Sequence, residues 1–221
     1  MSIALSLGNN LTTGGVFKAS AVNNTSCNNI TDFAGIAGGG TLILLSTQTA
    51  SASASISFTT GIDSTYDEYV FKYINLHPAT NNAYLTFQGS TDGGSNYGVT
   101  TTSTAFSAVH DEADTATSLD YNTSRDLAQS TAFIPIQVDG VSNNDDGSCV
   151  GILHLFNPSS TTYVKHFINV DQNMGQTVAY SFNAFNAGYL NTTSAINAIQ
   201  FKFSSGNIDD GIIKMYGVAK S

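Results

Sequence analysis

Residues 41–78 read TLILLSTQTASASASISFTTGIDSTYDEYVFKYINLHP, and this stretch decides the fold class. Its apolar residues occur in short bursts, separated by serine and threonine tracts and by the turn sequence at 61–64. Short apolar runs bounded by turn formers are typical of β-strands. We expect two strands joined by one turn. The first includes the small-residue stretch 51–57. The second is a long central strand over 66–76 that ends at Pro78, because proline lacks the N–H that a sheet requires.

The composition favours an all-β fold for the rest of the chain. Only 10% of the residues are charged, against about 25% in an average globular protein, and serine, threonine and asparagine are abundant. These side chains compete for backbone hydrogen bonds and weaken helices, whereas β-branched residues suit strands. We expect further strands at residues 84–88, 131–138, 150–157, 163–170, 177–185, 198–203 and 212–218. The resulting prediction is an antiparallel two-sheet β-sandwich of jelly-roll type, with Pro135 at an edge or a bulge.

Residues 1–40 differ from the rest because their apolar residues are too few to build a core. We assign them to an N-terminal segment and residues 41–221 to the sandwich. Such a segment is either a disordered leader or an extended arm whose contacts with a partner offset the entropy of ordering it. The alternation of apolar and polar residues at its start favours the arm. Its candidate interface residues are Ile3, Leu5, Leu7, Val16, Phe17 and Phe33.

A polar stretch at residues 97–126 is the second candidate for a functional segment, and it contains few apolar residues. We expect it to be a long loop, and long loops in compact domains commonly serve binding or assembly. Its acidic group, which comprises Asp111, Glu112 and Asp114 beside His110, offers the carboxylate oxygens that Ca²⁺ prefers. A solvated acidic loop that binds no ion explains the same residues. Its aromatic rings are suited to stacking on a sugar. The candidate ligand-binding residues are Tyr97, His110, Asp111, Glu112, Asp114 and Tyr121.

The charge of the chain argues against nucleic acid and anionic membranes as partners. There are 7 Lys and Arg residues against 16 Asp and Glu residues, a net charge of −9, and the cations are scattered. Binding to nucleic acid requires a basic patch. The first residues, MSIALSLGNN, lack the segments of a secretory signal, and no apolar run is long enough to span a membrane. We therefore expect synthesis in a cytoplasm.

No motif predicts catalysis, a metal or a cofactor. Cys27 and Cys149 have no metal-ligand spacing, so they are either two free thiols or one disulfide. A serine-nucleophile elbow and a phosphate-binding glycine loop are both absent from the sequence. Nearly all carboxylates fall in expected turns rather than on the strands of a cleft, where a glycosidase would need them. The sequence thus predicts a protein that is not an enzyme.

Three stretches of the chain resemble a known group of proteins. They are STQTASASASISFTTGIDSTYDEYVFKYINLHPAT at residues 46–80, LTFQGSTDGGSNYG at 85–98 and GNIDDGIIKMYGVA at 206–219. Their pattern is similar to that of small jelly-roll virion structural proteins of marine tailed bacteriophages, and the similarity extends over residues 41–221. The residues at 208–211 depart from the Ser-Gly turn that is usual in that group. All these motifs are structural rather than catalytic.

The resemblance implies a structural or host-contact role in a phage virion, often as a homotrimer. In one hypothesis the N-terminal arm docks on other capsid or tail proteins, and the sandwich assembles as a capsid decoration, a cement protein or a tail appendage. In the alternative, the protein is a tail-fibre module that binds a receptor or a host-surface glycan through residues 97–126. Both hypotheses place the protein in the virion after synthesis in the bacterial cytoplasm.

Overall fold

The computed structural model describes residues 42–175 and 180–219, and these residues form strands, turns and loops but no helix. Within them there is accordingly no helix that is long and apolar enough to cross a membrane. The chain divides into two units, Met1–Gly38 and Gly39–Ser221, and all the strands below belong to the second. The candidate arm residues between Ile3 and Phe33, together with Cys27, lie outside the described residues.

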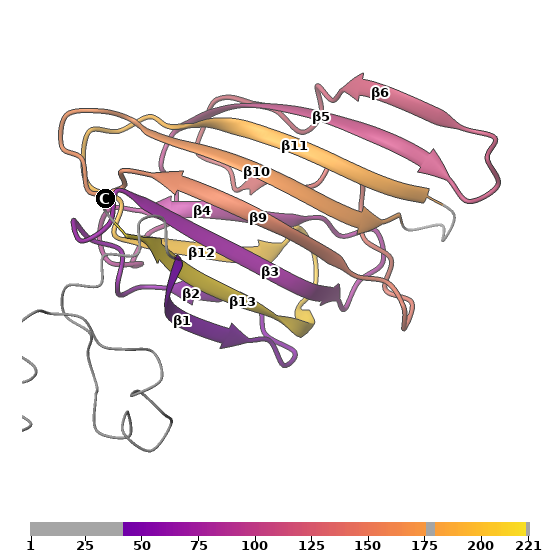
Figure 1. Cartoon of the computed structure of the whole chain (residues 1–221), viewed down its shortest axis with the longest axis horizontal. Coiled ribbons are helices and arrows are strands. Elements are labelled where there is room, and N and C mark those ends of the chain that lie inside the picture. The colour runs from indigo at the N-terminus through magenta and orange to yellow at the C-terminus, as the bar shows by residue number, and fades with distance from the viewer. Residues whose placement is uncertain (1–41, 176–179, 220–221) are drawn as a thin grey trace, which may run out of the picture. The chain divides into compact units, whose positions relative to one another are not determined.

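The strands form two antiparallel sheets (Figure 1). The larger sheet has the order β1, β13, β3, β9, β10, β11, β5, β6, with β7 also paired to β5. Its strands are β1 (Leu42–Thr49), β3 (Glu68–Pro78), β5 (Thr101–Asp111), β6 (Thr117–Tyr121), β7 (Leu127–Ser130), β9 (Cys149–Phe156), β10 (Lys165–Met174), β11 (Tyr180–Leu190) and β13 (Ile208–Val218). The smaller sheet has the order β2 (Ile56–Phe58), β12 (Ala198–Phe203), β4 (Leu85–Ser90), β8 (Ile134–Pro135). The predicted antiparallel sandwich is confirmed. The finer jelly-roll expectation is not confirmed by this strand order, which places β9, β10 and β11 as a meander in one large sheet.

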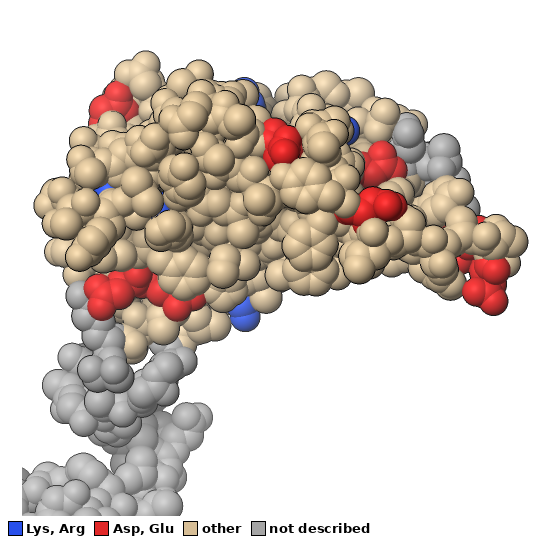
Figure 2. Space-filling view, turned by 90° about the horizontal axis from the view of Figure 1, so that it is seen from above, with Lys and Arg blue, Asp and Glu red and all other residues tan. Residues whose placement is uncertain are grey.

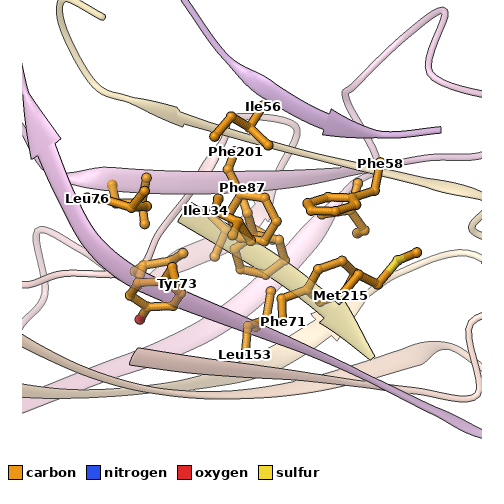
Figure 3. Close-up of a cluster of buried hydrophobic side chains, with 14 of the residues drawn as sticks. Ile56, Phe58, Phe71, Tyr73, Leu76, Phe87, Ile134, Leu153, Phe201 and Met215 are labelled. Carbon is orange, nitrogen blue, oxygen red and sulfur yellow. The ribbon is translucent and has the colours of Figure 1, made fainter. Parts of the chain in front are cut away.

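Aromatic side chains fill the space between the two sheets (Figure 3). Phe71 on β3 meets Phe58 on β2 edge to face, with ring centroids 5.4 Å apart, and Phe201 on β12 lies 5.6 Å from Phe71. Phe87 on β4 lies edge to face with Phe167 on β10 at 5.0 Å. Because burial of each such ring contributes about 1.5–3 kcal/mol, this cluster is what holds the small sheet against the large one.

Strand β3 confirms the prediction of a central strand, because it lies between β13 and β9. Tyr69, Phe71 and Tyr73 point into the core. A bulge then interrupts the alternation, since Asn75 adopts a positive φ of 50°. As a result Leu76 is buried although Ile74, two residues earlier, is 41% exposed. The strand ends at Pro78, as expected.

The prediction of two strands in residues 41–78 is wrong, because this stretch forms three. β1 belongs to the large sheet and β2 to the small one, so no single turn joins neighbouring strands. The chain leaves the large sheet after Thr49, and Ala52 takes a positive φ of 49° within the crossover. Most of the small-residue stretch 51–57 is therefore connection. Strand pairing resumes only where Ile56 and Phe58 can be buried in the core.

The strand expected at residues 131–138 is reduced to the two residues of β8. The backbone N–H of Ile136 still donates to the Leu85 carbonyl at 2.9 Å. One residue later the side chain of Gln137 replaces the backbone, because its Oε1 accepts the Leu85 N–H at 2.7 Å. Pro135 does lie on an edge strand of the small sheet, which confirms that part of the prediction.

The long loop expected at residues 97–126 is a β-hairpin for most of its length. β5 and β6 pair along five positions and extend the large sheet beyond β11. Along the first part of β5, the inward side chains of Thr101, Ser103, Ala105 and Ser107 alternate with outward ones. The inward side chains are small or polar, so the hydrophobic alternation that announces a strand is weak here. This is why the sequence pattern resembles a loop.

Candidate functional site

The outer face of the large sheet is the most extensive candidate binding surface among the described residues. The small sheet packs against its other face, and strand register with alternating burial shows which side chains point outward. On β6, β5, β11, β10 and β9 these outward positions are Thr117, Leu119, Tyr121, Thr102, Thr104, Phe106, Ala108, His110, Ser181, Asn183, Phe185, Ala187, Tyr189, His166, Ile168, Val170, Gln172, Val150, Ile152, His154 and Phe156. We call this set of positions the open face.

The open face contains no lysine, arginine, aspartate or glutamate. Two of its histidines lie beside carboxylates at its margins. His154 Nδ1 is 2.6 Å from Glu68 Oε1 at the β3 border, and His110 Nε2 is 3.2 Å from Asp114 Oδ1 in the β5–β6 turn. Figure 2, which views the molecule from above, likewise shows mostly uncharged surface with acidic side chains in a few separate groups. Recognition through the open face would therefore depend on apolar contact and uncharged hydrogen bonds rather than on ion pairs.

A row of apolar side chains crosses five strands of the open face. Strand pairing places Tyr121 opposite Phe106, Phe106 opposite Phe185, Phe185 opposite Val170, and Val170 opposite Ile152. The rings of Phe106 and Phe185 stack, with centroids 5.0 Å apart and planes 8° from parallel. These side chains remain accessible, for example 41% in Phe106 and 38% in Val170. Scattered exposed apolar residues are ordinary on a protein surface, whereas a contiguous apolar row indicates an interaction site.

A hollow of about 540 Å³ lies beside this row and is lined mainly by residues of β5, β10 and β11. Its floor is low because the outward side chain of Ala187 is small, and its walls include Ile168, His166 and Tyr189. The His166 and Tyr189 rings meet at 6.1 Å. We call this feature the central hollow. Its lining is largely apolar, which suits side chains of a protein partner or the ring faces of a small ligand.

Strand β10 places its polar and apolar residues opposite to the usual arrangement. Ile168 and Val170 point outward, whereas Asn169, Asp171 and Asn173 are buried between the sheets. The Tyr73 hydroxyl donates to Asn169 Oδ1 at 3.0 Å. A half-exposed strand normally buries its apolar residues and exposes its polar ones. The reversal in β10 therefore indicates that its outward face is also adapted to burial.

The buried carboxyl of Asp171 is held in its neutral form. Burial raises its pKa to about 8, which more than offsets the lowering by hydrogen bonds from Tyr73 and Gln137. Gln137 Nε2 donates to Asp171 Oδ2 at 3.4 Å. Within the described residues, Asp171 Oδ1 has no hydrogen-bond partner. The carboxyl is enclosed, so it lies too deep to act on a substrate at the open face.

The six ligand-binding residues predicted from the sequence do not form one site. His110 and Tyr121 are on the open face, at different ends of the β5–β6 hairpin. Tyr97 lies elsewhere, between β4 and β5, where its ring faces that of Phe133 at 6.5 Å. Glu112 and Asp114 are exposed in the β5–β6 turn. The expected grouping therefore fails because the hairpin separates its two ends along the strand direction.

Asp111 is committed to shaping the β5–β6 turn. Its carboxylate accepts hydrogen bonds from the Thr115 hydroxyl, the Thr115 N–H at 2.8 Å and the Ala116 N–H at 2.8 Å. These bonds, the one from the Thr115 hydroxyl foremost, lower the pKa of Asp111. In the same turn Asp114 lies 3.2 Å from His110 Nε2. The turn itself uses the carboxylate oxygens that the calcium interpretation required, and no three metal-binding side chains converge anywhere in the described residues.

No family model, curated protein or solved structure matches the chain. Function must therefore be inferred from the open face and from the sequence motifs.

Cys149 is buried, with its Sγ 3.6 Å from the Leu76 carbonyl oxygen, and burial raises the pKa of its thiol. A thiol in this state is a poor nucleophile. The open face itself was not anticipated, although the reversed pattern at 168–171 is a signal that could have indicated it.

Proposed function

We propose that this protein is a structural component of a tailed-bacteriophage virion, in which the open face makes contacts with protein. The observation that carries the proposal is a continuous uncharged apolar row on the outer side of a β-sandwich. Such a surface is suited to permanent contact, because its burial releases water without leaving a charge unpaired. The motifs at 46–80, 85–98 and 206–219, which resemble those of virion proteins, supply the context.

In this proposal the sandwich serves as a capsid decoration, cement or tail-appendage protein, and the N-terminal arm docks on other virion proteins. The protein acts by assembly and not by catalysis. Among the described residues, the geometry offers a broad face and shallow hollows in place of a cleft with converging acid, base and nucleophile. Homotrimer formation, which the resemblance implies, is part of the same proposal.

Particles purified from the phage that encodes the chain test this proposal. After a density gradient and a wash in high salt, mass spectrometry should find the protein in the particle fraction in many copies. An uncharged interface predicts resistance to the salt wash, since salt screens ion pairs but strengthens apolar contact. A host cytoplasmic protein followed through the same fractions serves as the control. Recovery of the chain in the soluble fractions alone would contradict a structural role.

A second candidate function is host-glycan binding, and the central hollow is the observation that favours it. Tyr189 and His166 present rings beside a floor formed by Ala187, an arrangement that accommodates a sugar face. On a glycan array we expect Tyr189→Ala to abolish binding. Tyr163→Ala is the control, because Tyr163 is exposed but lies outside the open face, and this variant should retain binding. Binding that also disappears with Tyr121→Ala or with a chelator would extend the ligand site to the β5–β6 hairpin.

A further inference from the structure

We infer that the occupant of the open face is a second copy of this chain. This inference deepens the proposed function and rests on its premise that the open face is buried in an assembly. The two elements that a self-complementary contact requires lie on the same face. One is the apolar cluster of Phe106, Leu119 and Tyr121 on β5 and β6, and the other is the central hollow on β10 and β11.

The apolar cluster projects from the face, whereas the central hollow recedes into it. Leu119 is 72% exposed and Tyr121 is 53% exposed, although both belong to regular strand pairing. The hollow has a volume of about 540 Å³ and lies around Ile168 and Ala187, with Thr102 and Thr104 of β5 in its lining. A contact between identical subunits succeeds when a projection on one fits a recess on the other. Each copy of this chain carries both parts.

Charge also favours a second copy. The chain carries a net charge of −9, so two copies repel each other wherever their acidic surfaces meet. The open face has no Asp or Glu at its outward positions, and the carboxylates at its margins, Glu68, Asp114 and Asp126, are paired with His154, His110 and the Tyr121 hydroxyl. Two copies that meet at the centre of the face therefore keep their carboxylates apart. A partner recognised through its own charges would find no opposite charge on this face. The open face is therefore a surface on which self-association meets little electrostatic resistance.

The size of the face matches what a stable contact needs. Five strands about 4.8 Å apart and up to about ten residues long, at about 3.3 Å per residue, cover roughly 700 Å². Specific protein–protein contacts bury about 800 Å² on each partner. Side chains beyond β9, at the outward positions of β3 and β13, are available to extend the contact. They include Ile74 on β3 and Tyr216 on β13, together with the charged side chains of Glu68 and Lys72 on β3 and Lys214 on β13.

The test measures the mass of the full-length protein by light scattering and analytical ultracentrifugation across a dilution series. We expect a dimer or a trimer. Leu119→Asp and Ile168→Asp should each weaken association by about 100-fold or more, because each would bury an unpaired carboxylate. Tyr163→Asp is the matched control, since Tyr163 is 70% exposed but lies in the loop between β9 and β10, and it should leave association unchanged. Thermal unfolding of every variant verifies that the sandwich is intact.

Cross-linking between copies provides a second measurement that does not depend on disrupting the face. In a Cys27→Ser background, protein carrying Leu119→Cys is mixed with protein carrying Ile168→Cys and oxidised. We expect mixed disulfide dimers, because the cluster of one copy lies in the hollow of the other. Replacing Ile168→Cys with Tyr163→Cys should give none.

Two results would overturn the inference. One is a monomer at every concentration without cross-linking, and the other is an oligomer whose stability neither aspartate variant changes. These results are separate from failure of the proposed function. A monomer that still purifies with virions would leave the structural role in place with a different occupant of the face. An oligomer that is absent from particles would leave the self-contact in place without a virion role.

Discussion

Asp171 lies on β10 between the two sheets and is 1% exposed, and burial raises the pKa of its carboxyl from 3.8 to about 8. The folded protein therefore retains this proton over an interval in which the unfolded chain releases it. The free energy of unfolding falls as pH rises from about 4 to about 8 and levels off above, because the unfolded state binds fewer protons. The pKa of Tyr73 and of Cys149 is also raised by burial, so both groups stay neutral in this window.

We predict that Asp171→Asn removes this pH dependence. Asparagine has nearly the same shape and stays uncharged, so the variant should exceed the wild type in stability at about pH 8 by a few kcal/mol, at about 1.4 kcal/mol per pKa unit. Near pH 4 the two should be almost equal. Urea unfolding followed by tyrosine fluorescence at a series of pH values measures this. Asp145→Asn, in the exposed turn before β9, is the control and should retain the wild-type slope, and parallel slopes for all three proteins would contradict the assignment.

The β5–β6 hairpin is the element whose geometry depends most on one side chain. Asp111 accepts three hydrogen bonds from Thr115 and Ala116, and these lower its pKa. We predict that Asp111→Ala opens the turn and accelerates amide hydrogen exchange at Thr115 and Ala116 several-fold, whereas Asp111→Asn, which keeps an acceptor oxygen, has a smaller effect. In the wild type the same protection should be present above the unfolded pKa of Asp111 and be lost as pH falls through its lowered folded value.

Exchange in β4 of the small sheet provides the internal reference for this measurement, because the side-chain hydrogen bonds of Asp111 are to Thr115 and Ala116 in the β5–β6 turn. Unchanged exchange at Thr115 and Ala116 in Asp111→Ala would show that the strand pairing alone holds the turn. Loss of protection throughout both sheets would instead show that the hairpin and the core unfold together, contrary to the local role assigned to Asp111.

Elements with strong alternation were predictable from sequence, whereas β5, in which the alternation is weak, was not. The strand expected at 163–170 is present as β10, but its reversed alternation was not recognised. The strand at 198–203 has the expected bounds, and β3 is a central strand as predicted, because large apolar residues mark both elements clearly. The sequence pattern predicts a loop where β5 lies, because the inward residues of this strand are small. In the candidate site, Tyr121 and His110 are two of the candidate residues named from the sequence, and both lie on the open face. Ile168 and Val170 were missed, because the reversal at 168–171 becomes visible only once the buried positions of the strand are known.

At the scale of the whole molecule, the described core is contained in the second unit. Its buried side chains extend from Ala50 to Met215, and both edges of the large sheet, β1 and β6, begin after residue 41. The folding of the sandwich should therefore not require the N-terminal segment. Since β1 starts at Leu42, a deletion of residues 2–37 leaves every described strand and its pairing partners intact.

We predict that this deletion changes the unfolding temperature, measured by circular dichroism, by no more than a few degrees. Cys149 should also stay unreactive toward a thiol reagent in the native state, because its thiol is enclosed by the sandwich. Deletion of residues 2–49, which also removes β1, is the contrasting variant. It exposes the edge of β13 and should lower the unfolding temperature or cause aggregation. If the shorter deletion already unfolds the protein, residues 2–37 contribute to the core itself. If the shorter deletion variant folds but no longer enters particles, then residues 2–37 are needed for docking and not for folding, as the proposed function requires.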